Sequence, residues 1–253
     1  MTLLRLENLT KSFGGLTAVS DVSFGVDEGT IMGLIGPNGA GKTTVFNLIT
    51  GNHRTDGGSV HFDNEDITNW PNYRIVALGI ARTFQTIRLF QNLTVIENVL
   101  AGCHCRMRSG PLAAMFHTPG ERKEEQGALE RALGDLAFVG LAGQEIQLAK
   151  NLSYGSQRLL EIARALATEP RLVILDEPAG GMNEQETAAL IGTIRRIQKR
   201  GITTLLIEHD MSLVMKACER IVVLEYGIKI AEGTPDAVKN DPKVIEAYLG
   251  MED

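Results

Sequence analysis

Hydrophobic and polar positions change their spacing repeatedly along the chain, which predicts strands that alternate with helices. Residues 3–9 and 19–26 alternate apolar and polar side chains, as half-buried strands do. Residues 30–35 are more continuously apolar, which indicates a central strand buried on both faces. The next apolar pattern begins at Lys42 and stops at Gly51, and it predicts a helix between them.

Later segments extend this alternation. Residues 60–62 are predicted to form a short strand that ends in the turn DNED, and residues 71–78 a helix with proline in its first turn. Thr94 has the spacing of a capping box, a pattern of side-chain hydrogen bonds at a helix start. Further helices are predicted at 128–141, at about 157–167, at about 183–199 and near the end of the chain. The helix at 183–199 is expected to be capped by Asn183 together with Glu186. Further strands are predicted at 172–175, 203–207, 221–224 and 229–231.

Strands alternating with helices around buried apolar runs predict an α/β fold with a largely parallel sheet. The middle of the chain, residues 86–165, is mostly helical in pattern. We expect it to form a subdomain inserted between two parts of a β core, residues 1–85 and 166–253, all within one domain. Residues 102–127 have no sustained period and are interpreted as a partly helical insertion.

Length and hydrophobicity limit how the protein can relate to a membrane. A chain of 253 residues can bury a sizeable core. No apolar run approaches the roughly 20 residues that a membrane span needs. The first residues, MTLLRLENLT, lack a basic region ahead of an apolar core, so they are not expected to be a signal peptide. Any membrane association is therefore expected to be peripheral.

The charge distribution argues against nucleic acid as a partner. The net charge is −6, with acidic and basic residues interspersed, whereas nucleic-acid binding depends on basic patches. A basic cluster at 195–200 lies at the polar end of a helical pattern and is interpreted as a solvated face.

The three cysteines, Cys103, Cys105 and Cys218, are too few and too scattered for a disulfide framework, which suits a reducing compartment. The run Cys103-His104-Cys105 raises the alternative of a zinc site. Alternate residues cannot easily chelate one ion, and no second pair lies nearby in sequence, so no zinc site is predicted.

The stretch GPNGAGKTT follows the apolar strand at 30–35 and fits G-x-x-x-x-G-K-[ST]. Its glycines would let backbone N–H groups curl around the β-phosphate of a nucleotide, and the helix that follows adds positive charge at its N-terminus. Lys42 should reach the β- and γ-phosphates, and the Thr43 hydroxyl should ligate Mg²⁺. An accidental glycine-rich turn is the alternative, but it would not need a strand before it and a helix after it. The predicted nucleotide-binding residues here are Gly36, Pro37, Asn38, Gly39, Ala40, Gly41, Lys42, Thr43 and Thr44.

A second element ends the apolar strand at 172–175 with Asp176 and Glu177. Carboxylates at this position project from the carboxyl edge of a parallel sheet, where α/β folds bind ligands. Asp176 is placed to hold Mg²⁺ through water, and Glu177 is the candidate base that polarises the attacking water. An Asp-Glu pair after a strand is commonplace alone, but here it accompanies the phosphate-binding loop.

A third element, LSYGSQ at 152–157, precedes the helical run RLLEIARALA. Standing alone it would be an ordinary serine-capped helix start. With the two elements above, the chain resembles the ATP-binding cassette family over essentially its full length. In that family the loop, usually Leu-Ser-Gly-Gly-Gln, completes the ATP site of the opposite subunit, which implies nucleotide contacts from Ser153, Gly155 and Ser156.

The resemblance also implies the architecture: a P-loop NTPase core, antiparallel β strands near the N-terminus and an inserted α-helical subdomain. Three single residues gain roles from it. Phe13 matches the aromatic that stacks on adenine. Gln85 matches the glutamine that senses Mg²⁺ and the γ-phosphate. His209 matches the switch histidine that holds the γ-phosphate and orients the water.

Two positions depart from the family pattern. Ser156 stands where the signature usually has glutamine, and Asn183 stands where the loop after the base commonly ends in aspartate. Both loops belong to the subunit interface in this family. The departures therefore concern how this chain completes a partner's site more than whether it binds ATP.

A finer resemblance is to the ATPase subunits of branched-chain amino acid importers. It is carried by RTFQ at 82–85, LTVIENV at 93–99, IEHDM at 207–211 and the segments EGTP and AYLG near the end. Machines for urea, short amides or lipopolysaccharide share much of this pattern and remain alternatives. A soluble cassette ATPase of DNA repair or translation, or a simple P-loop kinase, is a more distant alternative.

The resemblance implies an ATP-hydrolysing subunit, dependent on ATP and Mg²⁺, at the cytoplasmic face of the membrane. Two copies, or this chain and a paralogue, would close head-to-tail on two ATP molecules. The implied partners are this second ATPase, two membrane permease subunits and, indirectly, an external substrate-binding protein. Lys42, Glu177 and His209 are the expected catalytic residues, and Thr43, Gln85 and Asp176 the expected metal-binding residues.

Overall fold

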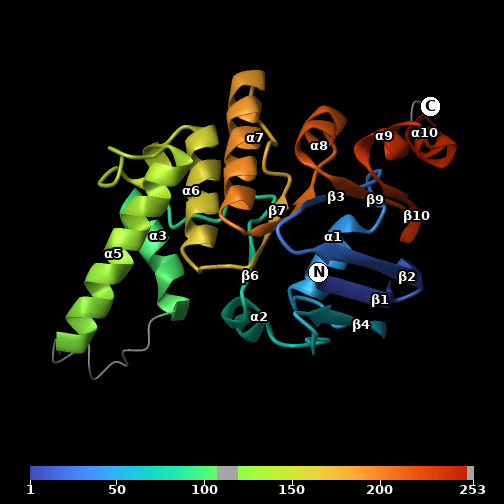
Figure 1. Cartoon of the computed structure of the whole chain (residues 1–253), viewed down its shortest axis with the longest axis horizontal. Helices are drawn as coiled ribbons and strands as arrows, with labels where there is room; N and C mark the ends of the chain where they lie inside the picture. The colour runs from blue at the N-terminus through green and yellow to red at the C-terminus, as the bar shows by residue number, and fades with distance from the viewer. Residues whose placement is uncertain (107–118, 250–253) are drawn as a thin grey trace.

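The computed structural model describes residues 1–106 and 119–249 (Figure 1). Within these residues the strands form two sheets. The first sheet has the order β2-β1-β4-β5, and its pairs are antiparallel. Its strands are β1 (Thr2–Phe13), β2 (Leu16–Asp27), β4 (Gly57–Phe62) and β5 (Glu65–Asp66).

The second sheet has the order β10-β9-β3-β8-β7-β6 and is parallel except for β10, which pairs antiparallel with β9. Its strands are β3 (Ile31–Ile35), β6 (Ile80–Arg82), β7 (Leu172–Asp176), β8 (Thr203–Ile207), β9 (Arg220–Glu225) and β10 (Ile228–Gly233). The described helices are α1 (Lys42–Ile49), α2 (Asn72–Leu78), α3 (Val95–Cys103), α5 (Pro119–Val139), α6 (Tyr154–Leu166), α7 (Glu184–Lys199), α8 (Met211–Ala217), α9 (Pro235–Lys239) and α10 (Pro242–Leu249).

Alternate side chains of the central strands divide the interior into two cores. On β3, Met32 and Leu34 join a core with α1 and the antiparallel sheet, so α1 lies between the two sheets. Ile31 and Ile35 point to the opposite face, where α7, α8 and the helices farther from the antiparallel sheet cover the parallel sheet. All five residues of β3 are buried, as expected for a central parallel strand. The α/β fold predicted from the sequence is confirmed.

Helices α3, α5 and α6 pack against one another at one end of the molecule (Figure 1). Their buried residues belong to the same core as one face of the parallel sheet. All three begin inside the predicted helical segment 86–165, while the subdomain boundaries themselves stay a prediction. The capping box at Thr94 is confirmed, with both of its reciprocal hydrogen bonds to Glu97 present.

The predicted insertion at 102–127 is only partly described, because residues 107–118 lie outside the described residues. Its two flanks belong to the fold. Cys103 is buried at the end of α3, and the Arg106 side chain donates hydrogen bonds to the carbonyl oxygens of Thr168, Ala77 and Glu169. Helix α5 begins at Pro119, earlier than the pattern predicts, because charged residues occupy its first turns and hide the period.

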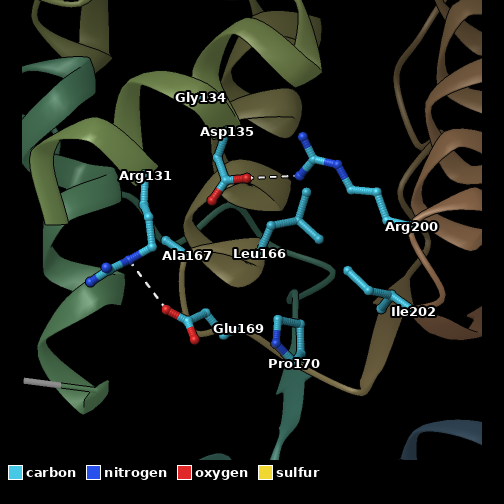
Figure 2. A pocket seen from close by; sticks show the side chains of 9 residues that line it. All are labelled: Arg131, Gly134, Asp135, Leu166, Ala167, Glu169, Pro170, Arg200 and Ile202. Atoms are coloured by element: carbon cyan, nitrogen blue, oxygen red, sulfur yellow. Dashed lines mark hydrogen bonds and ion pairs between the residues drawn. The ribbon is translucent and has the colours of Figure 1, made fainter. Parts of the chain in front are cut away.

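A cavity of about 520 Å³ lies where α5 meets the beginnings of β7 and β8 (Figure 2). Two ion pairs cross it. Arg131 of α5 lies 3.2 Å from Glu169, and Asp135 of α5 lies 3.0 Å from Arg200 at the end of α7. The two ion pairs thus connect α5 to the segments just before β7 and β8 of the parallel sheet.

Candidate functional site

The carboxyl ends of β3, β7 and β8 meet at one edge of the sheet, because these strands are parallel and adjacent. Asp176, the last residue of β7, is in register with Ile207, the last residue of β8. The glycine-rich loop follows β3 at the same edge. Three stretches far apart in the sequence therefore place their loops side by side.

The glycine-rich loop at 36–41 has a backbone that side chains could not follow. A Cβ atom on Gly36 would lie 2.1 Å from the Leu224 carbonyl oxygen, and one on Gly41 would lie 2.5 Å from that of Ala18. Gly41 has φ of 96° and caps α1 without any side-chain hydrogen bond. The first N–H groups of α1 therefore have no side-chain acceptor at the cap, which suits an anionic ligand.

Lys42 folds back over this loop. Its Nζ donates hydrogen bonds to the carbonyl oxygens of Gly36 at 2.6 Å and Pro37 at 2.9 Å. Burial lowers the pKa of Lys42, while the carboxylates of Glu177 and Asp176 oppose that shift. The ammonium group is thus held by the loop and is within the electrostatic influence of the two acidic residues.

The other predicted residues of the loop differ in exposure. Asn38, Gly39 and Thr43 are exposed, Pro37 and Thr44 are half-buried, and Gly36 and Ala40 are buried.

Asp176 is buried and bound to an arginine that the sequence analysis gave no role. Arg82, at the end of β6, donates from Nη2 to Asp176 Oδ2 at 2.9 Å. Its Nη1 donates to Asn47 Oδ1 in α1 and to Thr50 Oγ1 just after it. Burial raises the pKa of Asp176, and Arg82 opposes this rise. Arg82 therefore links the Asp176 carboxylate to Asn47 and Thr50 and so holds it beside α1.

Glu177 has a backbone φ of 46°, in the left-handed region that few residues other than glycine adopt. This conformation turns its side chain out of the strand direction. Its carboxylate Oε2 accepts a hydrogen bond from Gln85 Nε2 at 2.8 Å and lies 3.9 Å from His209 Nδ1. The structure thus brings together three residues that the sequence analysis singled out, and strain at such a position is typical of functional sites.

A cavity of about 490 Å³ lies beside this group. Thr43, Gln85 and Asp176 all line it, together with His53. They offer a hydroxyl, an amide oxygen and a carboxylate, and such oxygen donors suit Mg²⁺. Among residues 1–106 and 119–249, no group of three His, Cys, Asp or Glu side chains could hold a metal ion.

Phe13 contacts His53, one of the residues that line this cavity. Its side chain is exposed, and its ring packs edge-on against His53 with 5.3 Å between the ring centroids. Lys11 Nζ lies 5.3 Å from the same ring. The sequence analysis missed His53, because an isolated histidine in a loop carries no local signal.

The loop at 153–156 is not among the described residues that line this cavity. Ser153 caps α6, its Oγ accepting from the Ser156 N–H at 3.2 Å. A Cβ atom on Gly155 would lie 2.7 Å from the Glu186 carboxylate, so this loop packs on the start of α7. The predicted capping box of Asn183 with Glu186 is confirmed. Because Gly155 packs against Glu186, the loop that contains Ser156 and the loop that ends at Asn183 are neighbours within one chain.

Glu208 is a second buried residue that the sequence analysis gave no role. Its Oε1 accepts a hydrogen bond at 2.9 Å from the N–H of Ala179, in the loop after Glu177. Burial raises the pKa of this carboxyl group. The only sequence signal for Glu208 was its position next to His209. The hydrogen bond of Glu208 to Ala179 connects the loop after β8 to the loop after β7.

Comparisons with known proteins agree with this geometry. The family described as ABC transporter matches residues 19–180, and the family described as branched-chain amino acid ATP-binding cassette transporter matches residues 229–252. The high-affinity branched-chain amino acid transport ATP-binding protein BraF of Pseudomonas aeruginosa is 45% identical over 98% of this chain and 98% of its own. LivG of Escherichia coli, with the same description, is 44% identical over the same shares.

Solved structures give the same result. The ADP conformation of an ATP-binding cassette of an ABC transporter matches 99% of this chain and 99% of its own, with a TM-score of 0.87 and 38% identity. A dimeric ATP-binding cassette in a post-hydrolysis state, bound to ADP and Pi, covers 92% of this chain and 99% of its own, with a TM-score of 0.77 and 25% identity.

Proposed function

This chain belongs to the ATP-binding cassette family of transporters, and we propose that it hydrolyses ATP to power the import of branched-chain amino acids. ATP binding, and hydrolysis coupled to transport, is the activity of this family. The observation that carries the proposed chemistry is the Glu177 carboxylate, held by Gln85 and His209 beside the glycine-rich loop.

The glycine-rich loop and the start of α1 bind the phosphate chain. Backbone N–H groups of the loop and of the first turn of α1 face the β-phosphate, and the helix start, which has no side-chain cap, adds its positive end. Lys42 exchanges its bonds to Gly36 and Pro37 for phosphate oxygens, which carry full negative charge. Phe13, which packs against the cavity residue His53, stacks on the adenine.

Thr43, Gln85 and Asp176 would hold Mg²⁺, whose bound charge would neutralise the oxygens of the β- and γ-phosphates. Arg82 keeps Asp176 in place by its bond to Oδ2.

Hydrolysis converts ATP and water to ADP and phosphate, and Glu177 is the group that activates the water. Its carboxylate accepts a hydrogen bond from the attacking water and draws the proton away as the new P–O bond forms. Gln85 donates to the same carboxylate and keeps it aimed into the site. His209 is exposed and its Nδ1 approaches the same Oε2 atom at 3.9 Å, a position from which it can turn toward the γ-phosphate.

A second ATPase subunit completes each site. Ser153 is exposed and Ser156 is half-buried, and neither lines the cavity of its own chain, so both are available to the nucleotide of a partner that faces it head-to-tail. Gly155 is buried between them, and we assign it a backbone contact to the same nucleotide. A related cassette of known structure is dimeric, which supports this arrangement. The partner is a second copy or a paralogue.

Two permease subunits and an external binding protein complete the importer. None of the described helices has the length and apolar character of a membrane span. We assign the passage through the membrane to the permease subunits. We place this chain at the cytoplasmic face, as a peripheral subunit. A mostly apolar groove between α2, α3 and α6, bordered by Phe84 and Phe90, is the surface offered to a permease.

Uptake by the reconstituted importer tests the cargo. The chain would be purified with the permeases and binding protein encoded beside it and placed in vesicles that contain ATP. Labelled leucine, isoleucine or valine should accumulate, and urea or a short amide should not compete. Accumulation of urea or amides instead would assign the ATPase to a related importer.

Phe13→Ala should weaken ATP and GTP binding together, by about 1–3 kcal/mol, because any base can stack on an aromatic ring. The exposed ring makes this an affinity effect without a large change in melting temperature. Calorimetry with both nucleotides measures it, and Leu133→Ala, which removes a similarly exposed side chain on α5, is the control. A lower melting temperature with unchanged affinity would show that the ring serves the fold instead.

A further inference from the structure

Helix α6 carries a buried ion pair to which the chemistry above gives no role. Arg158 is 3% exposed and Glu161 is 2% exposed, and Arg158 Nη1 lies 3.3 Å from Glu161 Oε2. Burying two charges is costly unless other hydrogen bonds satisfy them. The partners of this pair therefore indicate what the pair holds.

Arg158 binds the loop at 84–85 and, at the same time, the first residue of its own helix. Its Nη1 donates to the Phe84 carbonyl oxygen at 2.7 Å, and its Nη2 donates to the carbonyl oxygen of Gln85. The same Nη2 donates to the hydroxyl of Tyr154 at 3.1 Å. A planar guanidinium with several fixed donors can make these contacts together, whereas an ammonium group cannot span them.

Glu161 binds the same loop by accepting hydrogen bonds from the backbone N–H groups of the loop. Its Oε1 accepts from the N–H of Phe84 at 3.3 Å and from that of Arg88 at 3.4 Å. Both backbone polar groups of Phe84 are thus bound by one buried pair. The side chain of Gln85, the next residue, points to Glu177.

Tyr154 brings the signature loop into the same network. Its ring packs on Gly181, where a Cβ atom would lie 2.9 Å from the ring carbon Cε1. Gly181 belongs to the loop that follows Glu177. The family's usual signature has glycine at the position of Tyr154, and glycine has no hydroxyl to offer Arg158.

We propose that Arg158 is a positioning residue that fixes the Gln85 loop against the start of its own helix α6, whose first turn and cap carry the signature residues 153–156. In the proposed function, Gln85 serves the nucleotide of its own chain and Ser153 serves that of the partner. Arg158 then makes both loops take their ATP-bound positions together. This inference rests on the proposed function, because both loops owe their roles to it.

Arg158→Lys tests the proposal, because lysine keeps a positive charge beside Glu161 but cannot bind the two carbonyl oxygens and the Tyr154 hydroxyl together. We expect the turnover number of ATP hydrolysis to fall about 10-fold, since small misplacements of catalytic groups have large effects on rate. The affinity of the isolated chain for MgATP should change less than about 2-fold. Arg220→Lys is the control, because Arg220 forms a salt bridge of 2.9 Å with Glu232 between β9 and β10, outside the Gln85 loop and α6. Its turnover should equal that of the parent.

Two further variants separate positioning from a purely structural role. Combined with Gln85→Ala, Arg158→Lys should cause little additional loss, because a residue that acts through Gln85 has nothing left to position. Tyr154→Phe removes only the hydroxyl and should slow turnover by about 3-fold at unchanged melting temperature.

Two outcomes would overturn the inference: parental turnover in Arg158→Lys, or multiplicative losses in the double variant. A parent protein that hydrolyses no ATP in its complete complex would instead refute the proposed function.

Discussion

Glu177→Gln is expected to slow ATP hydrolysis by about 10²–10⁴, the usual contribution of a general base, while MgATP binding persists. Glutamine has nearly the same shape, and its side-chain oxygen can still accept the hydrogen bond from Gln85. It carries no charge, however, and an amide is too weak a base to take the proton from water. The backbone φ of 46° constrains both residues equally, so the fold should be unaffected.

The variant should also accumulate a closed dimer that holds ATP, because hydrolysis no longer empties the two sites. Size-exclusion chromatography with MgATP detects this species, and ADP should abolish it. Disrupting Ser153 or Gly155 in addition should prevent it, since these residues act from across the interface. If a paralogue is needed, the dimer will form only in the mixture.

A matched control is Glu184→Gln, which neutralises an exposed carboxylate in the first turn of α7. Its rate should equal that of the parent. Parental turnover by Glu177→Gln in the complete complex would remove Glu177 as the base.

Lys42→Ala should lower MgATP affinity by about 10²–10⁴, corresponding to two lost hydrogen bonds to charged groups at about 1.5–3 kcal/mol each. The side chain is held over the loop by the carbonyl oxygens of Gly36 and Pro37, so its cation is positioned before the nucleotide arrives. Its pKa is lowered by burial and raised by Glu177 and Asp176, and a bound phosphate would further favour the charged form.

Isothermal calorimetry measures this loss, with circular dichroism to show that the fold persists. Lys199→Ala, at the exposed end of α7, is the control and should bind ATP normally. Equal affinity in Lys42→Ala and the parent would contradict the assignment of the loop at 36–44 to the phosphates.

Local patterns were sufficient to predict the elements whose signals lie within a few residues. The glycine-rich loop, the apolar strand before Asp176 and the capping boxes at Thr94 and Asn183 each combine a short spacing with a specific backbone geometry. The strand β6 was missed because it has only three residues and lies between a helix and a polar loop.

The residues that orient the site could not be predicted in this way. Arg82, Arg158 and Glu208 owe their roles to partners brought close only by folding, namely Asp176, the Gln85 loop and Ala179. A buried charge has no sequence signature of its own, because the same residue type is usually exposed. Such positions are therefore found only from the assembled structure.

The strand order of the parallel sheet has a consequence for protein synthesis. Strand β3, which carries the phosphate-binding loop, pairs with β8 from Thr204 onward and with β9 from Arg220 onward. Both neighbours are made late by the ribosome, so IMGLI at 31–35 emerges without a strand to pair with. Such long-range pairing slows folding and leaves apolar surface open to aggregation. Nascent chains that stop before β8 should therefore need a chaperone and should not yet bind ATP.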